Sequence, residues 1–247
     1  MPNAHTEVWI VDIAQRADEG DRPPDELSWL MAGWLSASEW DGARGLRHPL
    51  IRRQHLMGRV LARTRLAHRL GVAPRRVSFA SAPSGKPYAL LDGAAISVHF
   101  NISHSGERVA LALAECEVGI DIERRAPDID APALARRFFA PAEAQWIESG
   151  GPRISQRFGA LWALKEACLK MQGAGLPGGL GGFTFQRTGF RHVRTVAVEA
   201  AEAPAAVPAN WHCSLRALPD YWAAVCTLLP FAQSRWHQIT AEALAVS

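Results

Sequence analysis

Apolar and polar positions alternate along several short stretches of the chain, and such alternation predicts β-strands. The first stretch is EVWIVDI at residues 7–13, and residues 96–123 hold two further strand-like runs joined around Ser105 and Gly106. Four later segments are also expected to be strands, which would close a second sheet: residues 183–190, 191–200, 211–218 and 221–229.

Apolar residues spaced three or four positions apart predict helices. Residues 50–70 form a long amphipathic helix by this pattern, and Gly71 is its expected C-terminal cap. Just before it, Ser36 precedes Glu39 by three positions, which is capping-box spacing and predicts the start of a short helix. The long helix is expected to carry a cationic flank made of three arginines: Arg52, Arg59 and Arg63.

Two helical patterns follow in the second half of the chain. Residues 131–147 have helical spacing with a break at Pro141, and residues 155–173 form a helix that ends at Gly173. An apolar stripe on the second of these helices is expected to face the core: Phe158, Leu161, Trp162, Cys168 and Leu169.

The composition is that of a folded protein with one large domain or two small ones, because 48% of its 247 residues are hydrophobic. The polar, Pro-bearing stretch between Arg124 and Pro132 is the expected junction between two halves. No apolar run is long enough to span a bilayer and no secretory pattern begins the sequence, so we expect a cytoplasmic protein. The four cysteines form no C-x-x-C pair and are expected to be reduced thiols.

Arginine is the usual cation of this chain. The net charge is only +3, and of 27 basic residues just three are lysines: Lys86, Lys165 and Lys170. Several arginines lie between Arg44 and Arg69, where they are suited either to binding phosphate or simply to keeping the surface soluble.

The segment VGIDIERR at residues 118–125 carries two acids two positions apart on a predicted strand. Because side chains alternate along a strand, Asp121 and Glu123 lie on one face and the apolar residues between them on the other. Two carboxylates this close repel each other unless a cation lies nearby. The cation is either a neighbouring arginine, Arg124 or Arg125, or a magnesium ion, which prefers carboxylate oxygens.

Polar side chains gather in two further places. Glu166 and Lys170 are four residues apart on the predicted helix and therefore neighbours, which is compatible with an ordinary ion pair or with a site. In FNISHSG, His104 lies among hydroxyl groups beside a glycine turn. Such a mixture suits a structural turn or a phosphate ligand.

Four short motifs occur in a fixed order: GKP at 85–87, FNISHSG at 100–106, GIDIE at 119–123 and FGALWALKEACLKMQGAGL at 158–176. In this order and spacing they resemble the Sfp-type 4′-phosphopantetheinyl transferases. The upstream stretches LSASEW and RRQHLMGRVLAR resemble the N-terminal half of that family. The resemblance extends over about residues 5–230.

This resemblance implies transfer of 4′-phosphopantetheine from coenzyme A to a serine of an apo acyl or peptidyl carrier protein, with release of 3′,5′-ADP. It implies that a Mg²⁺ or Mn²⁺ ion is held by Asp121, Glu123 and Glu166. It also implies that Glu166 activates the carrier serine and that Lys170 stabilises charge on the diphosphate, so that Asp121, Glu166 and Lys170 form the catalytic set. Which carrier is modified is left open.

Contacts to coenzyme A are implied for eight residues: Arg44, Arg47, Arg53, Lys86, Pro87, Asn101, Ser103 and His104. The fold implied is α+β, with two pseudo-symmetric halves that are each a small, mostly antiparallel sheet packed with helices. We expect the halves to be residues 1–125 and 126–247, with the active site between them.

The expected partners are coenzyme A and the carrier protein, and the chain is expected to be a monomer that binds neither membrane nor nucleic acid. Two alternatives remain. One is another magnesium-dependent phosphoryl or nucleotidyl transfer enzyme. The other is a nucleic-acid-binding module that uses the helix near Arg44 to Arg69, although its net charge is low for such a role.

Overall fold

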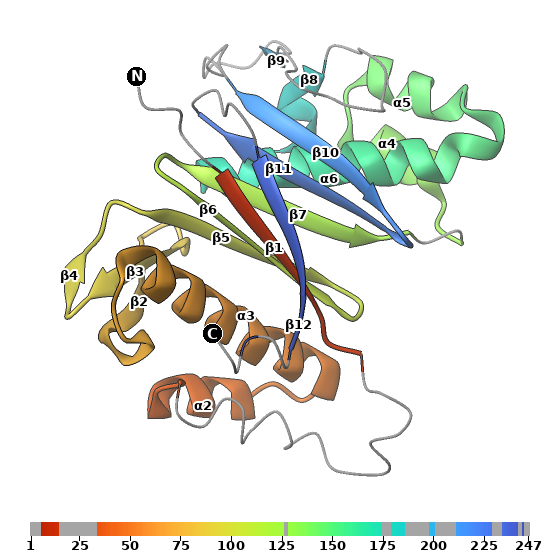
Figure 1. Cartoon of the computed structure of the whole chain (residues 1–247). Helices are drawn as coiled ribbons and strands as arrows, with labels where there is room; N and C mark the ends of the chain where they lie inside the picture. The colour runs from red at the N-terminus through yellow and green to blue at the C-terminus, as the bar shows by residue number, and fades with distance from the viewer. Residues whose placement is uncertain are drawn as a thin grey trace.

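The computed structural model describes residues 6–14, 34–125, 128–173, 179–185, 198–200, 211–228, 234–241 and 244. They form two principal sheets whose apolar faces pack together, with a long helix against the outer face of each sheet (Figure 1). The expected α+β class, with largely antiparallel sheets packed with helices, is therefore confirmed.

The N-terminal sheet has the order β12-β1-β6-β5. Its strands are β1 (Thr6–Asp12), β5 (His99–Ser105), β6 (Arg108–Ala114) and β12 (Ser234–Thr240). Neighbours pair antiparallel except β12, which runs parallel to β1 and brings the end of the chain back to the first sheet. We did not predict β12 from the sequence.

Helix α3 (Pro49–Leu70) covers the outer face of this sheet, and α2 (Ala37–Arg44) packs against it. The predicted caps are confirmed, because Gly71 has a φ of 65° and Ser36 forms a capping box with Glu39. The predicted cationic flank is wrong at Arg63. Its guanidinium is buried against Glu39 and the carbonyls of Val77 and Trp34, which replace the hydrogen bonds of water.

The C-terminal sheet has the order β10-β11-β7 and is antiparallel throughout. Its strands are β7 (Val118–Arg124), β10 (His212–Leu218) and β11 (Tyr221–Thr227), and helix α6 (Ile154–Gln172) covers their outer face. Helices α4 (Ala131–Phe138) and α5 (Pro141–Glu148) pack on α6, with the predicted break at Pro141. Gly173 ends α6 as predicted, with a φ of 74°.

The smaller elements form separate sheets. Strands β2 (Val77–Ser81), β3 (Pro87–Leu91) and β4 (Ala94–Ala95) make one, and β8 (Phe183–Phe185) and β9 (Val198–Ala200) make another. The prediction that residues 183–200 help to close the second sheet is therefore wrong for β8 and β9, which pair only with each other among the described residues. The rest of that predicted stretch, residues 186–197, lies outside the described residues.

Strand membership bears on how the halves divide. β7 belongs to the C-terminal sheet, so a boundary drawn by sheet falls before Val118 rather than after Arg125. β12, in turn, crosses back to the N-terminal sheet. Within the described residues, no helix is long and apolar enough to cross a membrane.

Candidate active site

The two sheets meet along a seam between β5 and β7, which three side chains of β5 close. Asn101 Oδ1, Ser103 Oγ and Ser105 Oγ accept hydrogen bonds from the backbone N–H groups of β7. Their partners are Ile120, Ile122 and Arg124, at distances of 2.9, 3.3 and 3.0 Å. Side-chain oxygens thus do here what backbone carbonyls do in an ordinary sheet.

The alternation predicted for β7 is confirmed. Ile120 and Ile122 are buried in the apolar layer between the sheets, whereas Asp121 and Glu123 lie on the face toward α6. Gly119 shares this second face, and a Cβ atom there would come within 2.0 Å of the Ala167 carbonyl oxygen. The absence of a side chain therefore lets β7 approach α6 closely.

Asp121 is held by two partners from different elements. Lys170 Nζ of α6 lies 2.5 Å from its Oδ1, and Ser103 Oγ donates to the same oxygen at 2.9 Å. Lys170 also donates to Ser103 Oγ at 2.8 Å. The other carboxylate oxygen, Oδ2, is buried and has no hydrogen-bond partner among the described residues. Asp121 thus pairs with Lys170, and neither Arg124 nor Arg125 takes that place.

The environment of the other two acids favours their protonated forms. Burial, followed by the charge of Asp121, raises the pKa of Glu123 to about 7, although a hydrogen bond from Ser105 Oγ opposes the shift. Burial and the charge of Asp121 also raise the pKa of Glu166, against the effect of Lys170. The three carboxylates therefore interact across the space between β7 and α6, and a cation there would relieve their repulsion.

Their ligand atoms are nevertheless not gathered tightly. In the described part of the chain, no choice of one oxygen each from Asp121, Glu123 and Glu166 brings the three atoms within 4.8 Å of one another. Shared binding of one ion therefore requires rotation of these side chains. Glu123 and Glu166 are only half-buried, which leaves them room to rotate.

Helix α6 presents Trp162, Glu166 and Lys170 in one half-buried row, spaced four residues apart. Glu166 and Lys170 are therefore neighbours on one face of this helix, as predicted. Lys165, which the sequence places beside them, faces away instead. It is fully buried, 2.8 Å from Glu143, and donates to the carbonyls of Leu180 and Phe183.

The residues expected to contact coenzyme A occupy different settings. Lys86 Nζ contacts Glu117 Oε2 at 2.5 Å and the Met171 carbonyl near the end of α6 at 2.8 Å, and Pro87 begins β3. Glu117 was not anticipated. Asn101 and Ser103 are 6% and 4% exposed, so their visible role is to join β5 to β7.

His104 and the three arginines are more accessible. His104 is exposed on β5. Partial desolvation of its ring by the surrounding protein, followed by the charge of Lys170, nevertheless lowers its pKa. Arg44 is exposed and pairs with Asp41, and Arg47 is exposed between α2 and α3. Arg53, in the first turns of α3, donates to the Ile13 carbonyl at 3.0 Å.

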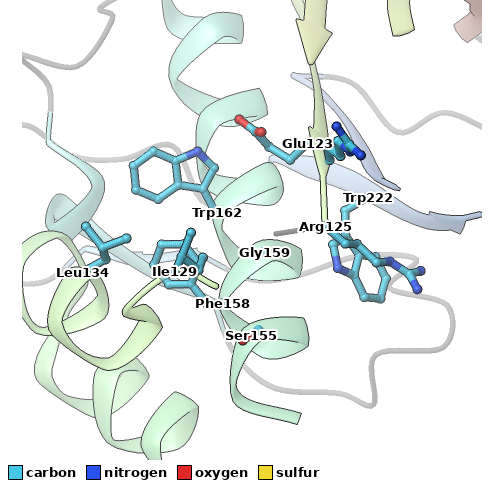
Figure 2. Close-up of a pocket in the computed structure, with 10 residues that line it drawn as sticks. Glu123, Arg125, Ile129, Leu134, Ser155, Phe158, Gly159, Trp162 and Trp222 are labelled. Atoms are coloured by element: carbon cyan, nitrogen blue, oxygen red, sulfur yellow. The ribbon is translucent and has the colours of Figure 1, made fainter. Parts of the chain in front are cut away.

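An apolar pocket of about 260 Å³ opens beside Glu123 (Figure 2). Glu123 and Trp162 stand at one end of it, and Trp222 borders the other side, where Arg125 stacks over its ring at 4.6 Å. Trp222 Nε1 is buried without a hydrogen-bond partner among the described residues. The remaining lining residues are Arg124, Ile129, Leu134, Ser155, Phe158 and Gly159.

We did not predict this pocket, because Phe158 and Trp162 have the spacing of an ordinary core stripe. We also did not predict the role of Ser105. A signal for it exists in the sequence, since Asn101, Ser103 and Ser105 alternate on one face of a strand. Small polar residues repeated in this way indicate that one face of the strand forms hydrogen bonds with a neighbouring segment.

Comparison with known proteins identifies the family. The profile described as "4′-phosphopantetheinyl transferase superfamily" matches residues 117–226, and "4′-phosphopantetheinyl transferase, N-terminal" matches residues 50–116. The two matches meet immediately before β7.

Individual relatives agree. The chain is similar to the 4′-phosphopantetheinyl transferase of Bacillus subtilis, with 36% identity over 70% of this chain and 76% of that protein. It is 34% identical to the 4′-phosphopantetheinyl transferase psf-1 of Bacillus pumilus over 85% of both chains. A Synechocystis relative is 37% identical over 59% of this chain and 60% of its own length. The chain therefore belongs to the 4′-phosphopantetheinyl transferase superfamily.

Proposed function

We propose that this 4′-phosphopantetheinyl transferase moves the phosphopantetheine group of coenzyme A onto a serine of an apo acyl or peptidyl carrier protein and releases 3′,5′-ADP. The observation that carries the proposal is the meeting of Asp121, Glu123, Glu166 and Lys170 between β7 and α6 in a chain of this family. Acids that repel one another suit a divalent cation, and such a cation beside a lysine would suit the handling of a diphosphate.

We propose that Asp121, Glu123 and Glu166 hold Mg²⁺, or Mn²⁺ in its place. The buried, unpartnered Oδ2 of Asp121 and the raised pKa values of the other two acids support this, because a hard cation would satisfy the first and lower the others. When bound, the ion neutralises charge on the diphosphate.

The protein's own groups supply the remaining steps. Glu166 accepts the proton of the carrier serine, because a carboxylate placed beside the hydroxyl group can act as its general base. The serine oxygen then bonds to the phosphorus that bears pantetheine, and the bond from that phosphorus to the oxygen of the departing 3′,5′-ADP breaks. Lys170, which is 29% exposed, donates to the diphosphate oxygens once it leaves Asp121.

Coenzyme A is proposed to lie across the seam. Lys86, His104 and the arginines near the start of α3 offer donors for its phosphates, while Asn101 and Ser103 hold β7 in place. The pocket beside Glu123 supports a position for the pantetheine arm, because its walls are mostly apolar. We further propose that the enzyme acts as a monomer in the cytoplasm.

Mass spectrometry of a carrier protein tests the proposal. The protein is incubated with coenzyme A, Mg²⁺ and each of several apo carrier proteins, and we expect one carrier to gain the mass of phosphopantetheine. EDTA should abolish the gain. If no carrier in a panel of acyl and peptidyl types gains this mass, the proposal is wrong.

The matched variants are Asp121→Asn and Asp92→Asn. The first should lower the rate at least ~100-fold, because it removes a ligand at the centre of the site. The second alters an exposed aspartate that pairs with Arg76 and should leave the rate unchanged. Equal activity of the two variants would remove Asp121 from the site.

A further inference from the structure

Three cysteines from three elements meet in the core beneath α6. Cys168 of α6, Cys213 of β10 and Cys226 of β11 are each 0% exposed. Their sulfur atoms lie 3.4 Å apart for Cys168 and Cys213, 3.2 Å for Cys168 and Cys226, and 2.6 Å for Cys213 and Cys226. The last contact is closer than two sulfur atoms that are not bonded normally approach.

The backbone already has the geometry for a bond between the closest pair. Cys213 and Cys226 are direct partners in the antiparallel register of β10 and β11. Directly opposite residues have Cα atoms about 4.5–5.5 Å apart, which lies inside the span of about 4.4–6.8 Å that a disulfide bridges. Cys168 comes from a helix and has no such register with either strand.

A metal ion fits this cluster less well than a disulfide. Among the described residues, the three cysteines are joined by no histidine or acid, so three thiolates around one ion would bury net negative charge. Lys165, the cation whose charge reaches Cys168, is already paired with Glu143. Such a charge is costly in an apolar core, whereas a disulfide is neutral.

We propose that hydrogen peroxide converts Cys213 and Cys226 into a cross-strand disulfide and leaves Cys168 a thiol. The Cys213 sulfur bonds to one peroxide oxygen, the O–O bond breaks, and the second oxygen leaves as water. The Cys226 sulfur then bonds to the Cys213 sulfur, the S–O bond breaks, and a second water leaves. Two thiols are oxidised by two electrons and one peroxide is reduced.

The cluster also indicates which sulfur reacts first. Burial opposes a thiolate at this place, but hydrogen bonding with Cys168 and Cys226 and the charge of His212 outweigh it and lower the pKa of Cys213 to about 5. Once the strands open enough to admit peroxide, the lower pKa favours Cys213 over Cys226, whose pKa burial raises, as the sulfur that attacks. The bond would join β10 to β11 and constrain the unfolded chain, so the oxidised protein should be more stable.

The test uses the full-length protein, first reduced and then treated with hydrogen peroxide. It is unfolded, its free thiols are blocked with N-ethylmaleimide, and its peptides are analysed by mass spectrometry. We expect the number of blocked cysteines to fall from four to two, with a cross-linked Cys213–Cys226 peptide that dithiothreitol separates. Four blocked cysteines after treatment, or a cross-link that contains Cys168, would overturn the proposal.

Variants and a thermal measurement separate the bond from general oxidation. Cys116→Ala, outside the cluster, and Cys168→Ala should both retain the cross-link, and Cys226→Ala should lose it. Peroxide should raise the melting temperature of the unchanged chain by several degrees, and dithiothreitol should restore the original value. Peroxide should not raise the melting temperature of Cys226→Ala. Elemental analysis of the purified protein is the last arm, because one bound metal per chain that Cys168→Ala removes would assign a metal site instead.

Discussion

At the scale of single residues, the Ser103 hydroxyl has three partners in the site. It accepts from the Ile122 N–H and from Lys170, and it donates to Asp121. A hydroxyl group has one proton and two lone pairs, so this arrangement uses all of its capacity. The orientation of the acid therefore depends on a residue that need not touch the substrate.

Replacing this hydroxyl should harm both stability and turnover. In Ser103→Ala, the Ile122 N–H and Asp121 each lose a buried partner, so we expect a loss of about 1–3 kcal/mol in the free energy of unfolding. Carrier modification should slow roughly 10- to 100-fold because Asp121 is no longer oriented. Urea unfolding and the carrier mass assay measure the two effects.

The matched control for this change is Ser78→Ala on β2, where the serine is exposed. It should change neither quantity. Normal turnover in Ser103→Ala would show that Lys170 alone is enough to hold Asp121.

Glu123 should give the metal-free protein a particular dependence on pH. Its pKa is about 7 in the folded chain against about 4.5 for a free side chain, so between these values the folded state binds more protons than the unfolded state. The stability that Glu123 contributes is therefore present below about pH 4.5 and is lost as the pH rises through 7. Thermal melting in EDTA, compared with Glu123→Gln, measures this contribution.

Added Mg²⁺ provides the second half of that comparison. It should raise the melting temperature of the unchanged chain more at pH 7.5 than at pH 5.5, because the ligand must be deprotonated. In EDTA, the melting temperature of the unchanged chain should fall relative to that of Glu123→Gln as the pH rises. The opposite trend would contradict the raised pKa assigned to Glu123.

Individual residues show what the sequence can and cannot predict. The faces of Asp121 and Glu123 follow from the strand period alone, and the structure agrees. The burial of Lys165 and Arg63 does not follow, because charged residues are normally exposed unless distant elements supply partners. For Lys165 these partners are Glu143 and two carbonyls, and for Arg63 they are Glu39 and two carbonyls.

At the scale of elements, the distance between β7 and α6 decides whether the acids of the strand face Glu166. Gly119 sets this distance, since a Cβ there would lie 2.0 Å from the Ala167 carbonyl oxygen and 2.4 Å from the Met171 nitrogen. Both of these atoms belong to the backbone of the helix. They cannot turn aside as a flexible side chain could.

Gly119→Ala should therefore push the helix away from the strand. We expect a loss of about 1–3 kcal/mol or more in the free energy of unfolding, together with slower carrier modification. Gly42→Ala is the control, because nothing lies within 4 Å of its added methyl and alanine favours a helix by about 1 kcal/mol. If Gly119→Ala matched Gly42→Ala in denaturant unfolding, the close approach would not be a constraint.

Elements were predicted well where their local pattern is strong. Helix α6 has an apolar stripe and a terminal glycine, and the β5–β6 hairpin has alternating residues around a glycine turn. Strand β12 lacks such a signal, because its residues are mostly polar and exposed. It is a strand because β1 offers it an edge, and this is a fact of tertiary structure.

At the scale of the whole molecule, β12 joins the two ends of the chain. The strand follows the C-terminal sheet in sequence but pairs with β1 in the N-terminal sheet (Figure 1). The first sheet is therefore incomplete until residues 234–240 have been made. Its strand order depends on a contact between residues more than 220 positions apart.

A chain that ends at residue 229 should show the importance of this pairing. Without β12 we expect a lower melting temperature and a broader unfolding transition, because β1 becomes an unpaired edge. A chain that ends at residue 244 is the control, because it keeps β12 and the buried Leu244, and it should melt at a higher temperature than the chain that ends at residue 229. Circular dichroism melting of the two shortened chains decides the question, and equal curves would mean that β12 adds no stability.

The seam between the sheets has a consequence for changing this protein. The oxygens of Asn101, Ser103 and Ser105 fasten one half of the molecule to the other, and the two serines also orient Asp121 and Glu123. The stability of the fold and the reaction rate therefore depend on the same side-chain oxygens. A substitution at either serine that alters the stability of the protein is therefore expected to alter its reaction rate as well.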